Sequence, residues 1–345
     1  MTPQIHVGNT SGSWLSTVAP VGGIEVDVRW PLGGYQLDFN LLLGPRKRPP
    51  VVSEGASAGL FVGGLPTFAG QVSEVDWSEG KITAIGMARV AETIPALTAD
   101  KLQTSSTPDV LVDTAISLGW NVTRPASLSS AAMASSDTTE SLNMTAAMLD
   151  MWAGDNGKRW YVDAASAVRS GVDPTTPEIY VLPGAGELSW STQKQADKII
   201  GQYADAQRRN RIATVGTGTN VRAVDLTGRG PLTSTQANGI LNQILAQSTT
   251  GGWVGGLTLA AGQITMPGGL HPSLGRVARM VSCGLMVRLL GHRDPRPGRF
   301  ALVTDVVIGQ AVWNVDDRTI TLTPLGSVAR DFAAIVESFG GQVAA

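Results

Sequence analysis

The chain has 345 residues, of which 43% are hydrophobic and only 16% are charged, and its formal net charge is −2. This length favours two or three domains with real cores, and the slightly acidic balance argues against a general nucleic-acid binder. A single cysteine excludes an intrachain disulfide, and no apolar run approaches the ~18 residues that span a bilayer.

The charged fraction lies well below the usual value of about a quarter, whereas glycine (41) and proline (19) are frequent. Such a composition predicts many turns and a surface that is partly covered in an assembly. The first residues, "MTPQIHVGNTSG", lack the basic flank and apolar core of a signal peptide. We therefore expect a protein that folds in the cytosol.

The first hundred residues show the alternation that is typical of β-strands. In residues 24–30, apolar side chains face one way and charged side chains the other. A turn at residues 31–34 leads into a second alternating run at 35–41, which predicts a hairpin. Further short strands follow at residues 59–64, 67–75 and 81–87. This spacing favours a small barrel or sandwich.

The middle of the chain changes character. Thr107, Pro108 and Asp109 form a start signal for a helix that Gly119 ends, and a second helix is expected over residues 142–153. The polar stretch 127–141 between them reads as a loop. Strands are then expected at 159–164 and 178–182, a third helix at 234–247, short strands up to residue 325, and a C-terminal helix at 329–339.

One hairpin pattern occurs twice in the chain. Gly70-Gln71 matches Gly309-Gln310, Ile82-Thr83 matches Ile320-Thr321, and Val90-Ala91 matches Val328-Ala329. The turn at residues 78–80 falls where the turn at 316–318 falls. Upstream, "SAGLFVGG" matches "SCGLMVRL", and the second copy then carries the longer loop 291–299. The pattern favours a duplicated β-domain over a chance likeness between hairpins.

The search for catalytic or metal-binding patterns gives no constellation. The three histidines (His6, His271 and His292) are scattered, and Cys283 is expected in an apolar strand as a buried structural residue. No nucleophile elbow or phosphate loop is present, and the pair Asp316-Asp317 reads as a hairpin turn rather than an acid–base pair. We expect no cofactor, no metal and no catalytic residue.

Arginines gather between residues 276 and 299, with Asp294 as the one acid among them: Arg276, Arg279, Arg288, Arg293, Arg296 and Arg299. Such a cluster fits contacts with nucleic acid or an acidic partner, or a solvated loop with ion pairs between subunits. No aromatic residues are interleaved to stack on bases. The residues predicted to make subunit or lumen contacts are Asp316, Asp317, Arg318, Glu79, Arg293, Arg296 and Arg299.

Taken together, four segments resemble the tail-tip or baseplate hub family of tailed bacteriophages, the minor tail proteins, in the style of siphophages that infect Actinobacteria. These segments are "FAGQVSEVDWSEGKITAIG", "PDVLVDTAISLGWNV", "LNMTAAMLDMWAGDNGKRWYVDA" and "VVIGQAVWNVDDRTITLTPL". The likeness lies in their order and covers nearly the whole chain. The family carries no catalytic motif to transfer.

The resemblance implies a homotrimer in which two barrels per subunit form a pseudo-sixfold ring. The ring would join the sixfold tail tube to threefold tip proteins and close or gate the DNA channel. Its implied partners are the distal tail protein ring, the C-terminus of the tape-measure protein and a central fibre, with DNA only in transit. Because no C-terminal fibre or wall-cutting extension is seen, receptor binding and wall hydrolysis are expected on other proteins.

The predicted fold is mainly β with an α+β middle: two similar β-barrel tube-type domains flank an inserted α+β domain. The expected limits are residues 1–97, 98–210 and 211–345, the last including a helix and the second barrel. Two other functions stay open, a virion-associated cell-wall hydrolase and a carbohydrate-binding adhesin. A zymogram and a cell-binding assay would separate them from a structural protein at the virion's tail tip.

Overall fold

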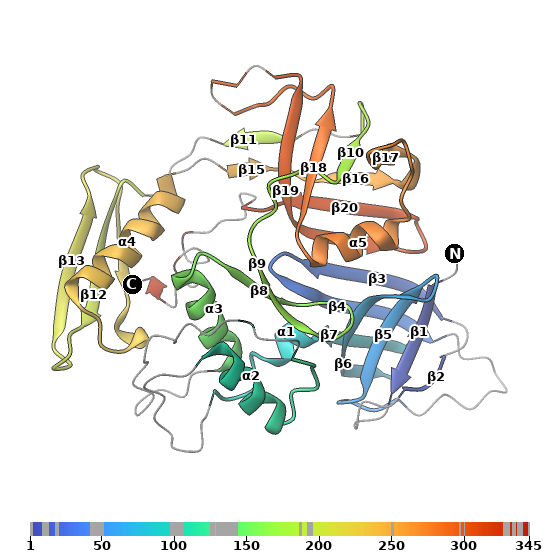
Figure 1. Cartoon of the computed structure of the whole chain (residues 1–345), viewed down its shortest axis with the longest axis horizontal. Coiled ribbons are helices and arrows are strands. Elements are labelled where there is room, and N and C mark those ends of the chain that lie inside the picture. The colour runs from blue at the N-terminus through green and yellow to red at the C-terminus, as the bar shows by residue number, and fades with distance from the viewer. Residues whose placement is uncertain are drawn as a thin grey trace.

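The computed structural model (Figure 1) describes residues 3–8, 14–17, 21–41, 52–96, 107–124, 128, 144–185, 188–191, 196–249, 252–296, 298–299, 301–326, 332, 336 and 341–343. Apart from Leu128, the predicted loop at 127–141 lies outside these residues. Of the predicted C-terminal helix at 329–339, only Phe332 and Val336 are described, and both are helical and buried. The chain is mainly β, as predicted, and its helices lie between residues 87 and 155 and between residues 234 and 282.

The predicted first hairpin is confirmed as β3 (Val21–Arg29) and β4 (Leu32–Leu41). Alternation buries one face of each strand, because successive side chains point to opposite sides. The buried residues are those that the pattern indicated: Ile24, Val26, Val28, Trp30, Leu37, Phe39 and Leu41.

Two antiparallel three-stranded units contain the repeated pattern. The first meander consists of β5 (Ser57–Val62), β6 (Leu65–Asp76) and β7 (Lys81–Gly86). The second meander consists of β18 (Leu285–Leu290), β19 (Val303–Asn314) and β20 (Thr319–Pro324). In each, strands of 6, 12 and 6 residues follow one another.

The long central strand changes partner in both meanders. The first part of β6 pairs with β5 and its second part pairs with β7, with a register shift between Val72 and Glu74. Likewise, β19 pairs first with β18 and then with β20, with a register shift between Ile308 and Gln310. The likeness read from the sequence therefore extends to strand length, order and pairing.

The β3–β4 hairpin joins the two meanders edge to edge, because β3 pairs with β19 and β4 pairs with β7. The sheet continues through β1 (Pro3–Gly8) and β2 (Trp14–Thr17) beside β5. Beyond the second meander it includes β10 (Ile179–Val181), β17 (Ile264–Thr265) and, beside β20, β16 (Leu257–Ala260). Among the described residues, this one curled sheet holds 15 strands.

Helix α5 (Leu274–Ser282) lies against this sheet and touches strands of both halves, including β3, β6 and β19 (Figure 1). Its buried face follows helical spacing, with Leu274, Val277, Ala278 and Val281 turned inward. The segment was not predicted as a helix, and Cys283 was wrongly expected inside a strand. Cys283 instead follows the last helical residue and is exposed.

A second core lies beside β4. It contains α1 (Met87–Val90), α2 (Pro108–Ser117), α3 (Thr145–Asp155), β8 (Arg159–Val162) and β9 (Val168–Gly171). The predicted start of α2 is confirmed, since the side chain of Thr107 accepts a hydrogen bond from the Val110 amide. Three fully buried tryptophans fill this core: Trp120, Trp152 and Trp160.

A third core lies at the left of Figure 1, where α4 (Ser234–Thr249) covers a four-stranded sheet. Its strands are β12 (Lys198–Ala204), β13 (Asn210–Gly216), β14 (Val221–Asp225) and β21 (Gln342–Val343). The predicted boundary between the second and third domains, after residue 210, falls within the hairpin that β12 and β13 form. The division into three domains with the limits given above stays a prediction.

The remaining elements are short. Strands β11 (Ser189–Ser191) and β15 (Gly252–Val254) pair near the second meander, and two single turns of 3-10 helix lie at Thr227–Arg229 and Ala261–Gln263. In the described parts of the chain, no helix is long and apolar enough to cross a membrane.

Candidate assembly surface

The predicted contact residues Glu79, Asp316, Asp317 and Arg318 lie in two equivalent turns, one at the tip of each meander. In the first, the Asp76 carboxylate accepts from the amides of Ser78 (2.8 Å) and Glu79 (3.3 Å). In the second, the Asn314 side-chain oxygen accepts from the Asp317 amide at 3.0 Å. Both turns end on a residue with positive φ, Gly80 at 70° and Arg318 at 55°.

The two turns differ in what their acidic residues do. A carboxylate oxygen of Asp316 accepts from the Gly23 amide at 2.6 Å, which ties the second turn to β3. The Asp316 carboxylate is therefore hydrogen-bonded to the backbone of β3. Asp317, Arg318 and Glu79 are exposed and free to meet another surface.

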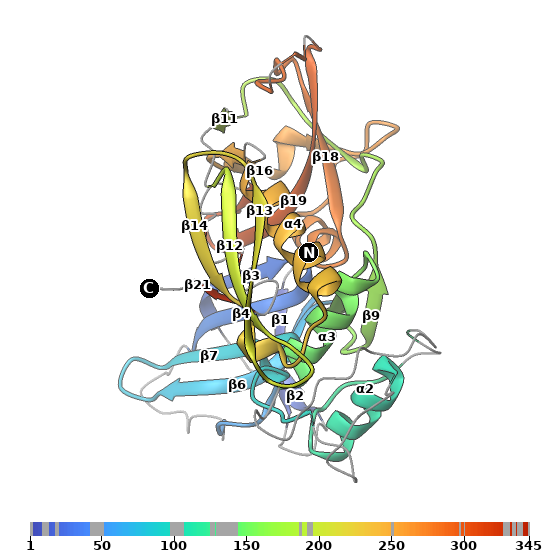
Figure 2. The same cartoon turned by 90° about the vertical axis from the view of Figure 1, so that its left-hand side faces the viewer.

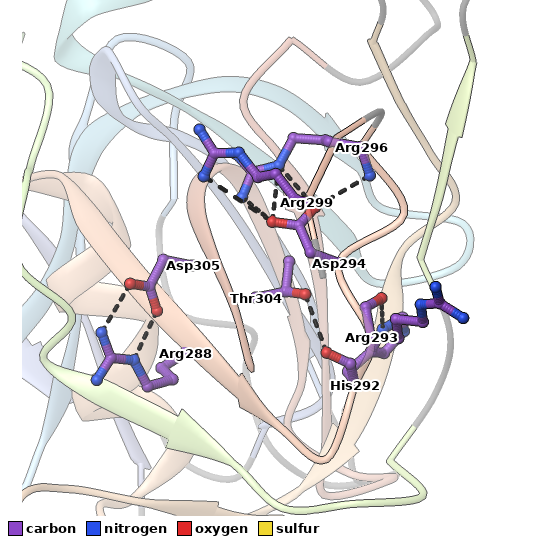
Figure 3. Close-up of polar contacts among 8 residues, drawn as sticks. All are labelled: Arg288, His292, Arg293, Asp294, Arg296, Arg299, Thr304 and Asp305. Atoms are coloured by element: carbon purple, nitrogen blue, oxygen red, sulfur yellow. Dashed lines mark hydrogen bonds and ion pairs between the residues drawn. The ribbon is translucent and has the colours of Figure 1, made fainter. Parts of the chain in front are cut away.

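The arginine loop, residues 291–299, lies between β18 and β19, and Figure 3 shows its polar contacts. At the equivalent place the first meander has only the turn Gly63-Gly64. Asp294 is buried, at 4% exposure, and binds the Arg296 guanidinium through contacts of 2.8 and 2.5 Å. Hydrogen bonds from Arg296 hold the pKa of the Asp294 carboxyl below its usual value. Arg299 lies 3.9 Å from the same carboxylate.

Further contacts fix the loop to neighbouring segments of the chain. The Arg296 guanidinium lies over the Trp253 ring, 5.2 Å from its centroid. The Leu188 amide donates to His292 Nε2 at 3.1 Å, so this nitrogen is an acceptor. The Thr304 hydroxyl donates to the His292 carbonyl at 3.1 Å. The loop is thus a folded polar structure with internal partners.

Arg288 is not part of a free cationic cluster. It pairs directly across the strands with Asp305, and two contacts of 2.7 Å join the guanidinium to the carboxylate. From the sequence, Asp294 was the one acidic residue expected to balance these arginines, and the partner role of Asp305 was missed. Arg293 is exposed, points away from Asp294 in Figure 3, and makes no ion pair with a described residue.

The chemistry-bearing residues stay apart from one another. His271 Nδ1 lies 2.7 Å from the Ile264 carbonyl, and the His6 ring packs edge-on against Phe61. Among the described residues, no group of three or more His, Cys, Asp and Glu side chains is placed to hold a metal ion. In the described part of the chain, the surface around the two meanders offers exposed turns and a structured polar loop.

Three solved structures of phage tail proteins share the fold. The 43 kDa tail protein of prophage MuSo2 from Shewanella oneidensis aligns with a TM-score of 0.63 at 11% identity, covering 95% of this chain and 100% of that chain. A tail protein from Neisseria meningitidis MC58 gives 0.57 at 12% identity over 93% and 95%. The prophage tail protein gp18 from Listeria monocytogenes EGD-e gives 0.50 at 12% identity over 98% of each. No family model and no curated protein matches the chain.

Proposed function

We propose that the chain is a structural virion protein, a homotrimeric hub at the distal tip of a phage tail. It adapts the sixfold tail tube to threefold tip or fibre proteins, and it closes or gates the DNA channel during genome ejection. The supporting observation is the pair of meanders with strands of 6, 12 and 6 residues in one chain that has the fold of phage tail proteins.

Symmetry explains why such a chain would be useful. Three chains that each carry two similar meanders present six similar units around one axis, and closed cyclic assemblies are the common solution for homo-oligomers. The β3–β4 hairpin fixes the spacing between the two meanders, since it is hydrogen-bonded to both. A duplicated tube-type domain interrupted by an α+β insertion accounts for this arrangement.

The charge pattern fits a protein that lets DNA pass without holding it. The net charge is −2, and the arginines at 288, 296 and 299 have acidic partners within the chain. A duplex-binding protein would carry a net basic excess to meet the phosphates, and this chain has none. We therefore place protein partners first: the distal tail ring, the tape-measure C-terminus and a central fibre, in a siphophage of Actinobacteria.

The role is non-enzymatic in this proposal. Two acids that could serve acid–base chemistry are committed to structural bonds, Asp316 to the Gly23 amide and Asp294 to Arg296. Exposed turn residues then serve as contacts between subunits or along the lumen: Glu79, Asp317, Arg318 and Arg293. A zymogram on host cell walls gives the direct check, because clearing by the purified chain contradicts this role.

The oligomeric state tests the proposal. Mass photometry of the purified chain is expected to show a species of about 108 kDa, three times the 36.0 kDa of one chain. If the trimer is stable only within the tail, cryo-EM of intact virions supplies the same answer. A strictly sixfold ring of this protein in the tail, with no threefold component, would refute the proposal.

A further inference from the structure

A large open groove lies beside α5, between the two halves of the sheet. Its volume is about 1540 Å³, above the range of about 300–1,000 Å³ that suits small ligands. Val62 and Leu65 from the β5–β6 turn form one wall, and Trp313 and Val315 from the second meander form another. The groove is therefore of a size that accepts a protein segment, and its walls are partly apolar.

The rim of the groove is basic. Arg276 and Arg279 from α5 and Arg318 from the second turn line it, with Glu178 as the acidic residue among the lining. These three arginines make no ion pair with any described residue, and Arg276 and Arg318 are exposed. Unpaired guanidinium groups around an apolar floor favour an acidic occupant with an apolar side chain at its centre.

The tip of the β6–β7 hairpin has this chemistry. Trp77 is 44% exposed there, although tryptophan is usually well buried. Glu74, Asp76 and Glu79 flank it in the sequence, and Lys81 is the one basic residue in the segment 74–81. Figure 2 shows this hairpin projecting from the body of the molecule.

The tip is also held in one shape. Asp76 accepts from the Ser78 hydroxyl at 2.6 Å as well as from the amides of Ser78 and Glu79. These bonds keep the pKa of the Asp76 carboxyl low, so it is charged at neutral pH. A preorganised loop loses little conformational entropy when it binds.

Within one chain, the tip and the Leu65 wall of the groove lie at opposite ends of β6. Leu65 lines the groove at the first residue of β6, and Trp77 follows the last residue of the same strand. Twelve residues of strand span about 40 Å at about 3.3 Å per residue. A tip at one end and a groove at the other form a head-to-tail contact, which closes into a ring when the rotation allows.

We propose that the β6–β7 tip of one copy, with Trp77 at its centre, docks in the basic groove beside α5 of a neighbouring copy. The acidic turn of a first meander then meets Arg318 in the equivalent turn of a neighbour's second meander. This contact deepens the proposed hub function and rests on it, because it supplies the joint between neighbouring subunits. Trp77 is the anchor, since aromatic residues in desolvated pockets dominate such interfaces.

Disulfide capture tests the contact directly. Cys283 is the chain's single cysteine and lines the groove, so Ser78→Cys places a second thiol on the tip. Mild oxidation at alkaline pH is used, because desolvation raises the pKa of the Cys283 thiol. We expect disulfide-linked dimers and trimers that disappear on reduction. Two controls should give little product: Ser78→Cys with Cys283→Ser, and Gln207→Cys, an exposed position in the β12–β13 turn.

The outcomes separate the contact from the proposed function. Disulfide-linked products of at most three chains support both the contact and the trimeric hub. Products of more than three chains support the contact and contradict the trimer. Absence of product overturns the contact at any oligomeric state, and a 108 kDa species in the same sample leaves the hub function standing.

A charge exchange tests the recognition chemistry. Glu79→Arg and Arg276→Glu, each combined with Ser78→Cys, should slow capture by about tenfold, because each places like charges face to face. The two changes together should restore the rate. Trp77→Ala should reduce capture at least as strongly. Unchanged rates in the three single variants would refute docking by this tip.

Discussion

Gly70 and Gly309 are the sixth and the seventh residue of two strands of 12 residues, and both lie where the strand exchanges one partner strand for the next. Neither position has room for a side chain. A Cβ atom on Gly70 would lie 2.2 Å from the Ile85 carbonyl oxygen, and one on Gly309 would lie 2.8 Å from the Leu325 Cα. The matching glycines are thus explained by crowding at the crossing point.

Alanine at these glycines is therefore expected to destabilise the fold. Overpacking against backbone should cost about 2–3 kcal/mol at Gly70, and less at Gly309 because the nearest atom is further away. Gly239→Ala is the matched control, since this helical glycine of α4 has open space around it and alanine favours helices. Urea unfolding measures all three. Equal stability of Gly70→Ala and Gly239→Ala would show that the crossing point tolerates a side chain.

Features that depend only on residues close together in the sequence could be predicted from the sequence. Alternation over residues 24–30 marked the buried face of β3, and Thr107 marked the start of α2. The repeated Gly-Gln letters located both central strands, because the crossing point admits only glycine in each. These signals need no knowledge of distant residues.

Features that depend on distant partners were missed. Gln310 donates to Asp27 at 3.0 Å although 283 residues separate them, and no spacing rule reveals that β3 and β19 pair. Asp305 neutralises Arg288 only through the β18–β19 register. Helix α5 did carry a signal, apolar residues at helical spacing after Ser273, but its arginines were read as part of a charge cluster.

Substitutions at the positive-φ position of the two equivalent turns should have opposite effects on stability. Gly80→Ala should lower stability by about 1 kcal/mol, because alanine is strained at positive φ. Arg318→Gly should raise stability by up to about 1 kcal/mol, because glycine relieves the same strain. Thermal unfolding is the measurement, with Asp317→Gly, at a neighbouring position without positive φ, as the control that should lose stability. A loss in Arg318→Gly as large as in that control would contradict the reading.

The stability of the arginine loop and its resistance to proteases should depend on Asp294. Asp294→Ala leaves the Arg296 guanidinium without its partner and is expected to cost about 2 kcal/mol. Trypsin cleavage after Arg293 and Arg299 should become faster, as limited proteolysis with mass spectrometry will show. Asp317→Asn removes an acid that makes no ion pair with a described residue and should leave cleavage unchanged.

The Asp294 carboxylate also makes a contribution to the stability of the fold that depends on pH. Because its folded pKa is lowered, Asp294 stabilises the fold above its unfolded pKa, and this stabilisation is lost as pH falls through the folded value. Wild type and Asp294→Ala should therefore become more alike in stability below about pH 4. A constant difference between them down to pH 2 would mean that the ion pair does not stabilise the loop.

Asp150 should make stability depend on pH in the opposite direction, because its pKa in the folded protein is raised. The pKa of this carboxyl is raised from 3.8 to about 6. Desolvation is the main cause and Glu92 adds to it, whereas hydrogen bonding from Trp160 Nε1 (2.6 Å) and the charge of Arg159 act in the opposite direction. A raised folded pKa gives stability that is fully present below about pH 4 and is lost as pH rises through about 6. The residue as a whole is exposed, so water screens the effect, and we expect about 1 kcal/mol.

Asp150→Asn tests this reading. The amide oxygen can still accept from the Trp160 indole, but it carries no charge at any pH. The variant should match wild type at pH 4 and exceed its stability by about 1 kcal/mol at pH 7.5 in urea unfolding. Glu92→Gln should weaken the pH dependence, because it removes the neighbouring negative charge. If wild type and Asp150→Asn lose stability equally between the two pH values, Asp150 is not the titrating group.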